Sequence, residues 1–290
     1  MKTPISIIVP IFNEEKRVEK GINRLLEVCD KENWDFEIII VEDGCTDNSV
    51  NIVKKISLKD RRVRIISLVN RYGKGGSIIQ AIRGCKKENI GYLDIDMSAD
   101  PSEFNRLFPY LQNNTLVIGS RILRGSLNPI QRPYYRTFLS KIYLLYFSTL
   151  FNAKIYDTQC GLKLFKKNDV LSVLSSIKTT GFAFDTEFII KMLVKGLVIK
   201  EVPINWIHVG DSKLKIHKAV FMMSKDLIKI WYDVLESQFN DTLYYNQCII
   251  RPKGLLRMIF KTRRSLLSLR TNLTLSMAES LQTVTKKIER

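Results

Sequence analysis

Short apolar runs alternate with helical patterns through the first half of the chain. Five runs predict strands, at residues 5–10, 36–43, 63–69, 91–96 and 115–121. Between them, apolar residues at helical spacing predict helices at about residues 14–29, 48–56, 76–85 and 103–111. Strands that alternate with helices in this way are typical of βαβ units. The sequence therefore predicts an α/β fold, with a mainly parallel sheet covered by helices on both faces.

The ends of these strands carry the candidate chemistry. In open sheets of this type, ligands bind beyond the carboxyl ends of the strands. Polar and charged residues gather at the predicted ends: Pro10–Glu14, Glu42 with Asp43, Asn70–Lys74, Asp94–Asp96, and Ser120 with Arg121. Acids end two of the strands and basic residues end two others, which is unusual for positions that serve only the core.

Asp94 and Asp96 end the fourth predicted strand. Two residues apart in an extended strand, their carboxylates share one face and repel each other unless a cation neutralises them. Mg²⁺ and Mn²⁺ prefer such oxygen ligands and commonly bridge to phosphates. The alternative is that these acids cap the next helix, a role that Asp100, directly before Pro101, fits better.

Two further strand ends allow a binding role or a structural one. Asp43 could accept hydrogen bonds from a base or a ribose, next to a turn at Gly44. Residues 71–77, RYGKGGS, lack the spacing of a Walker phosphate loop. They form either a glycine-rich turn that lets the backbone approach a ligand, with Lys74 reaching a phosphate, or a turn with no role in binding.

The chain carries 46 Lys and Arg against 29 Asp and Glu, a formal net charge of +17. This charge indicates an anionic partner: a nucleic acid, an anionic membrane or a phosphorylated substrate. Five widely spaced cysteines favour a reducing, cytoplasmic setting, and the N-terminus lacks the apolar core of a signal peptide. No apolar run reaches the ~18 residues of a membrane-spanning helix.

The second half of the chain is richer in aromatic and basic residues. Residues 138–151 are apolar but short and contain Lys141, which predicts a helix that is either buried or lies on a membrane. From Arg251 onward, ten Lys and Arg face only two acids. We therefore predict a catalytic domain at 1–240, with an interfacial helix at about 133–151, and a basic amphipathic extension at 241–290.

Several motifs occur in an order that resembles one enzyme family. They are SIIVPIFNEE (6–15), IIVEDGCTDNS (39–49), NRYGKGGSI (70–78), LDIDMSAD (93–100), IGSR (118–121), DTQCGLKLF (157–165), FAFDTE (182–187) and GDSKLK (210–215). Over about residues 4–235 the chain resembles the family 2 glycosyltransferases, in the branch of the dolichyl-phosphate glucosyltransferases and dolichyl-phosphate mannose synthases.

The resemblance implies a type A glycosyltransferase fold, a sugar-nucleotide donor and a role for each matching residue. It implies nucleotide binding by Pro10, Phe12, Glu14, Asp43, Lys74 and Asp94, and metal binding (Mg²⁺ or Mn²⁺) by Asp94 and Asp96. It implies catalytic roles for Asp96, Arg121 and Arg136 at the reacting phosphates, and binding of the acceptor phosphate by Arg136, Ser212 and Lys213. Asp185 and Glu187 are expected to contact the sugar or the acceptor, although helix capping accounts equally well for Asp185.

The expected reaction is transfer of a hexose, from UDP-glucose as first choice, to dolichyl or polyprenyl phosphate with inversion. GDP-mannose and UDP-N-acetylglucosamine are alternative donors. A hydroxyl acceptor is a second alternative, but the QxxRW motif of such enzymes does not occur in the chain. A basic membrane-binding or nucleic-acid-binding protein is the non-enzyme alternative, and it leaves the strand-end acids unexplained. We expect a peripheral protein on the cytoplasmic face of a membrane, without a nucleic-acid partner and of undefined oligomeric state.

Overall fold

A computed structural model describes residues 2–127, 134–151, 153–181, 183–207, 223, 225–234 and 236, with side chains in the helix at 134–151 described from residue 140 on. The chain divides into two compact units, Met1–Ile249 and Ile250–Arg290, and every described residue belongs to the first. The predicted basic extension at 241–290 therefore lies outside the described residues.

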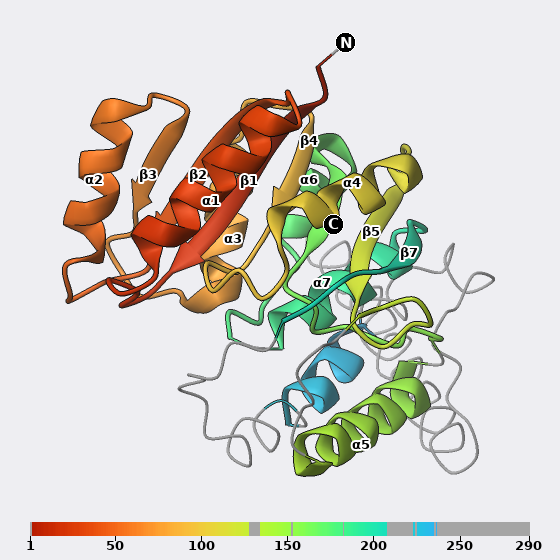
Figure 1. The fold of residues 1–290 in the computed structure, drawn as a ribbon. Helices are drawn as coiled ribbons and strands as arrows, with labels where there is room; N and C mark the ends of the chain where they lie inside the picture. The colour runs from red at the N-terminus through yellow and green to blue at the C-terminus, as the bar shows by residue number, and fades with distance from the viewer. Residues whose placement is uncertain are drawn as a thin grey trace, which may run out of the picture. The chain divides into compact units, whose positions relative to one another are not determined.

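The described part contains seven strands. They are β1 (Pro4–Ile11), β2 (Asp35–Glu42), β3 (Val63–Ser67), β4 (Asn89–Tyr92), β5 (Thr115–Ser120), β6 (Lys163–Lys166) and β7 (Val198–Pro203). They form one sheet in the order β3-β2-β1-β4-β6-β5-β7 (Figure 1). Strand β6 pairs antiparallel with β4 and β5, and the other pairs are parallel. Six of these seven strands therefore run in one direction.

Helices connect the strands. They are α1 (Val18–Lys31), α2 (Ser49–Lys59), α3 (Gly73–Gly84), α4 (Phe104–Leu107), α5 (Tyr134–Phe151), α6 (Lys167–Leu174) and α7 (Phe184–Val194), with 3₁₀ turns at Pro101–Glu103 and Phe108–Tyr110. The sequence prediction of α/β units is confirmed for the first five strands. Strands β6 and β7 were not predicted.

The core lies on both faces of the sheet because the central strands are buried on both. Ile5, Ile7 and Val9 of β1 join one buried cluster with apolar residues of α1, such as Ile22 and Leu25. The alternate residues of the strand point to the opposite face, where α3 packs on β1 and β2. Near-continuous apolar runs such as residues 38–41 are the sequence signature of this two-sided burial.

Several predicted boundaries differ from the structure by two to four residues, and two of them have a clear local reason. Helix α1 begins at Val18 rather than near Glu14, because Asn13 takes a left-handed conformation (φ 54°) and the Glu14 N–H donates to Ser49 Oγ at 2.8 Å. The fourth strand ends at Tyr92 rather than at residue 96, because the chain turns directly afterwards.

Candidate active site

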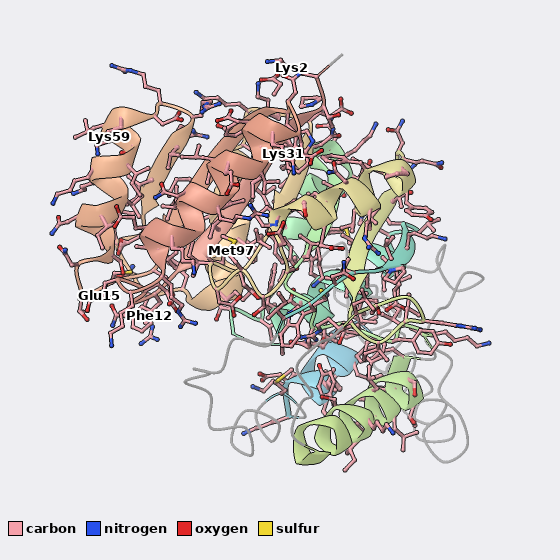
Figure 2. All side chains as sticks on the ribbon, in the orientation of Figure 1. Lys2, Phe12, Glu15, Lys31, Lys59 and Met97 are labelled. Carbon is pink, nitrogen blue, oxygen red and sulfur yellow. The ribbon has the colours of Figure 1, made fainter. Side chains whose placement is uncertain are left out.

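Six strand ends lie along one edge of the described sheet, since six strands share a direction. Phe12 and Glu15 follow β1 at this edge, and Figure 2 shows them at the opposite end of the sheet from Lys2. Strand β1 pairs with both β2 and β4, so the strand order reverses there. This reversal point is where open α/β sheets bind ligands.

Asp94 and Asp96 lie in a turn after β4. Met97, labelled in Figure 2, has φ 53°, a conformation uncommon for residues other than glycine. The Asp96 carboxylate accepts the Ser98 N–H at 2.9 Å, which closes the turn. The prediction that strand alternation places both carboxylates on one face was therefore wrong, because β4 ends at Tyr92 and neither aspartate lies in the strand. Both aspartates still lie just beyond a strand end, at the predicted edge.

Lys74 and Asp94 are brought together by the fold. Lys74 is the second residue of α3, and its Nζ lies 2.9 Å from Asp94 Oδ1. The Asp94 side chain is 43% exposed and the Lys74 side chain 20%. Burial disfavours the ammonium, yet the carboxylates of Asp185 and Asp94 outweigh it and raise the pKa of Lys74 above its ordinary value. Lys74 is therefore a charged group that reaches the aspartate turn.

Asp43 holds the beginning of α3. Its two carboxylate oxygens accept the N–H groups of Tyr72 at 2.6 Å and Gly73 at 2.8 Å, and the residue is only 4% exposed. Gly73 has φ 73°, and a Cβ there would lie 2.6 Å from the Thr180 carbonyl oxygen, so only glycine fits. The carboxylate thus supports the loop that presents Lys74, and base binding by Asp43 stays a prediction.

The other predicted nucleotide residues follow β1. Pro10 is the penultimate residue of that strand. The Arg71 guanidinium lies 3.8 Å from the centre of the Phe12 ring, a cation–π contact. The Glu14 carboxylate pairs with Arg17 at 2.8 Å. The fold thus places all three residues at or next to the carboxyl end of β1, the end of the sheet at which Asp94 follows β4.

Asp185 is the centre of a buried charge network. Its Oδ1 accepts hydrogen bonds from Lys163 Nζ at 2.6 Å and from the Tyr92 hydroxyl, and its Oδ2 lies 3.4 Å from Lys74 Nζ. Burial opposes its ionisation, but Lys163 and Lys74 outweigh burial and lower the pKa of Asp185 to about 2. Pairing with these groups, rather than helix capping, accounts for this carboxylate.

Glu187 serves a turn before α7. Its carboxylate accepts the N–H of Lys178 at 3.1 Å, and the N–H and hydroxyl of Thr179. The residue is 1% exposed. These contacts give Glu187 a structural role in the described part, and contact with a sugar or an acceptor stays a prediction.

Arg121 is fixed by a bidentate ion pair. Its Nε and one terminal nitrogen donate to the two oxygens of Asp157, each at 2.7 Å, and its guanidinium lies over the Trp206 ring. Burial disfavours the charge, but Asp157 outweighs it and raises the pKa of Arg121 above its ordinary value. Asp94 acts in the same direction, so Arg121 lies within electrostatic reach of the aspartate turn.

Comparison with known proteins identifies the family. The family model of glycosyl transferase family 2 matches residues 6–172, more than half of the chain. The chain belongs to the family 2 glycosyltransferases. It is 31% identical over 242 residues to the human dolichyl-phosphate β-glucosyltransferase, covering 78% of this chain and 74% of that protein. The Drosophila melanogaster protein of the same name is 27% identical over 241 residues.

Solved glycosyltransferases share the fold of this family 2 member. Glucosyl-3-phosphoglycerate synthase from Mycobacterium tuberculosis, solved with Mn²⁺, UDP-glucose and phosphoglyceric acid, superposes with a TM-score of 0.58 at 16% identity, covering 80% of this chain and 79% of that one. Mannosyl-3-phosphoglycerate synthase from Rubrobacter xylanophilus gives a TM-score of 0.62 at 14% identity, covering 82% and 75%. The predicted type A glycosyltransferase fold is confirmed.

Residues 157–163 hold several site residues in place, and sequence reasoning assigned none of these roles. Asp157 pairs with Arg121, and Lys163 pairs with Asp185. A Cβ at Gly161 would lie 2.0 Å from Asp94 Oδ2, so the aspartate occupies the space that only a glycine leaves open. The available signal was the motif DTQCGLKLF, in which polar residues and a glycine precede a short apolar run that contains a lysine.

The residues at the aspartate turn fit a divalent cation. Among the described residues, no cluster of three or more His, Cys, Asp or Glu side chains could hold a metal ion. Mg²⁺, however, commonly binds through one or two carboxylates and completes its shell with water and phosphate. The partly exposed Asp94 already faces one cationic group, the Lys74 ammonium, as such a ligand would.

Some predicted features lie at or beyond the limits of the described residues. Arg136 lies in α5, but its side chain is not described, and Ser212 and Lys213 lie outside the described part. No helix within the described ranges has the length and hydropathy needed to cross a bilayer.

Proposed function

We propose that the chain transfers glucose from UDP-glucose to dolichyl or another polyprenyl phosphate, with inversion at the anomeric carbon. The observation that carries this proposal is the Lys74–Asp94 pair, 2.9 Å apart at the edge of the sheet where the strand order reverses. The human and fly relatives, both dolichyl-phosphate β-glucosyltransferases, support the sugar and the acceptor. The synthase solved with UDP-glucose supports the donor.

In this reaction a phosphate oxygen of the acceptor forms the bond to the anomeric carbon. The bond from that carbon to the diphosphate breaks, and UDP leaves with the electron pair. An acceptor phosphate is already anionic at neutral pH, so the reaction requires no strong general base. The protein instead has to orient the two anions and stabilise the charge that develops on the diphosphate.

In the proposal, basic residues orient the two anions and stabilise the diphosphate. Lys74 and Arg121 stabilise the diphosphate, and each pairs with carboxylates in the described structure. Arg136, Ser212 and Lys213 bind the acceptor phosphate. Arginine and lysine are the side chains with which proteins hold phosphate groups.

Asp94 and Asp96 would hold Mg²⁺ or Mn²⁺, with Asp96 as the catalytic ligand. When bound, the ion supplies charge that neutralises the diphosphate leaving group. The use of Mn²⁺ or Mg²⁺ in crystals of the mycobacterial synthase supports this cofactor class. The partly exposed Asp94 supports access from solvent.

The donor nucleotide is proposed to lie along β1 and β2, against Pro10, Phe12, Glu14 and Asp43. Asp43 acts there at least through the loop that carries Lys74, which its carboxylate holds. Asp185 and Glu187 are proposed to shape the sugar and acceptor region from the beginning of α7. Their burial makes an indirect role, through Lys74 and the Lys178–Thr179 turn, the better supported one.

A membrane surface is the proposed working environment, because the acceptor is a lipid. Helix α5 exposes Ile142 (44%) and Leu145 (69%) beside the exposed Lys141. Apolar side chains next to a basic one suit a helix that lies on anionic lipid. We propose peripheral attachment at the cytoplasmic face through this helix and the basic extension at 241–290, with residues 1–240 as the catalytic domain.

The test is a product assay. Purified protein is incubated with polyprenyl phosphate, Mg²⁺ or Mn²⁺, and in turn radiolabelled UDP-glucose, UDP-N-acetylglucosamine and GDP-mannose. We expect a lipid-extractable β-glucosyl product from UDP-glucose, and its loss in Asp96→Ala. Lack of a lipid product from any donor, together with unchanged donor binding in Asp96→Ala, would overturn the proposal.

A further inference from the structure

Lys163 is a fully buried lysine next to the proposed donor site. It lies at the beginning of β6 with 0% exposure. Its Nζ donates to the Cys160 carbonyl at 2.7 Å, to the Thr158 carbonyl at 3.3 Å and to Asp185 Oδ1 at 2.6 Å. Taking an ammonium group out of water is strongly unfavourable, so a buried lysine needs this full set of partners.

The partners of Lys163 lead directly to the aspartate turn. Lys163 takes Oδ1 of Asp185, together with the Tyr92 hydroxyl, and leaves Oδ2 facing Lys74 at 3.4 Å. The Lys74 Nζ lies closer to Asp94, at 2.9 Å. Two cations and two carboxylates therefore alternate in the order Lys163, Asp185, Lys74 and Asp94. The Lys74 ammonium lies between the two carboxylates.

This order of charges decides where the Lys74 ammonium sits. Asp185 is 2% exposed, so its charge attracts nearby cations with little screening by water. With Lys163 present, one of its oxygens is already paired, and Lys74 remains at Asp94. Without Lys163, the whole carboxylate would draw Lys74 inward, away from Asp94 and from a bound diphosphate.

We propose that Lys163 is a positioning residue of the donor site, which keeps the Lys74 ammonium at the aspartate turn where it meets the diphosphate. The inference rests on the proposed function, because it takes a nucleoside diphosphate as the ligand of that turn. Lys163 itself contacts neither the ligand nor the reacting atoms; it acts through Asp185.

The test compares two nucleotides that differ in one phosphate. UDP and UMP share the base, the ribose and the first phosphate, so their affinity ratio reports the group that meets the second phosphate. Calorimetric titration in Mn²⁺ should show UDP binding about tenfold weaker in Lys163→Met, and UMP binding within about twofold of the unmodified protein. A general folding defect would weaken both nucleotides alike.

The chain offers a matched control in Lys191. The side chain of this lysine of α7 is 8% exposed and pairs with Asp233, 18% exposed, at 2.5 Å, so Lys191→Met breaks a partly buried lysine–aspartate pair. Its partner lies outside the charge network of Lys74. We expect Lys191→Met to lower the melting temperature and leave the UDP-to-UMP ratio unchanged.

A double variant keeps the test decisive if Lys163→Met fails to fold. Lys163→Met with Asp185→Asn removes one charge of each sign. Because position 185 then carries no charge that could draw Lys74 away from Asp94, the double variant should recover most of the melting temperature and most of the UDP-to-UMP ratio. A ratio that stays reduced in the folded double variant, or equal losses for UDP and UMP in Lys163→Met, would overturn the inference. Failure of the unmodified protein to bind UDP would overturn the proposed function, and the inference with it.

Discussion

Replacing Gly161 by alanine tests the placement of Asp94 most directly. A Cβ at position 161 would lie 2.0 Å from Asp94 Oδ2 and 2.6 Å from its Cγ, whereas Cβ atoms in proteins essentially never approach other atoms within 3.0 Å. The Asp94 carboxylate therefore has to move by about 1 Å or rotate away. Either movement breaks its 2.9 Å contact with Lys74.

The expected cost falls on binding more than on stability. An extra methyl group in a packed site costs about 1–3 kcal/mol. The Asp94 side chain is 43% exposed and can swing toward solvent, so we expect about 1 kcal/mol and a melting temperature about 2–4 °C lower. A misplacement of about 1 Å at a reacting site costs about a hundredfold in rate. We expect at least tenfold weaker binding of UDP with Mn²⁺, because both Asp94, the proposed metal ligand, and Lys74 are displaced.

Calorimetric titration of UDP in Mn²⁺, with thermal melts of each variant, measures both quantities. Gly181→Ala is the control, because a Cβ there meets no atom within 4 Å, and it should bind as the unmodified protein does. A folded Gly161→Ala variant with unchanged UDP affinity would refute the reasoning, since Asp94 would then not be the group that the nucleotide and its metal require.

Three further predictions follow from other contacts. Asp157→Asn should lower the free energy of unfolding in urea by about 3 kcal/mol, because it removes the carboxylate charge that pairs with the largely buried Arg121; a change below about 1 kcal/mol would contradict this pairing. Gly75→Ala should lower the melting temperature by several degrees, since its Cβ would lie 2.4 Å from Phe184 Cβ and helices α3 and α7 would have to separate. An unchanged melting temperature would show that α3 and α7 can move apart without loss of stability. The pKa of Asp185 is about 2 in the fold against an ordinary 3.8, so its ionised form stabilises the fold above about pH 4, and this contribution, about 2 kcal/mol, is lost as the pH falls toward 2. Unfolding free energies of the unmodified protein and Asp185→Asn should therefore converge between pH 5 and pH 2, and a constant difference would argue against the shifted pKa.

The parallel part of the fold was predictable because its signal is local. Continuous apolar runs such as residues 38–41 report a strand buried on both faces, and acids or glycines directly after them report the ligand edge. Strand β6 gave no such signal. It has four residues, KLFK, and its first lysine is fully buried, which contradicts the usual pattern of a core strand. Its burial depends on Asp185, 22 residues further along the chain, and a contact of that range is not visible in local spacing.

Asp43 and Asp94 show why the site was predictable only in part. Both are acids just beyond a strand end, and both were predicted to bind the donor. In the fold, both oxygens of Asp43 accept amides of the chain itself, and the residue is 4% exposed, whereas the Asp94 side chain is 43% exposed and faces an ammonium group. A strand-end acid can thus build a binding loop or project from one, and its position after an apolar run is the same in both cases. The difference lies in which groups the tertiary fold brings to each carboxylate. For Asp94 those groups come from α3, whose Lys74 pairs with it, and from residues 157–163, whose Gly161 leaves the space that its carboxylate occupies.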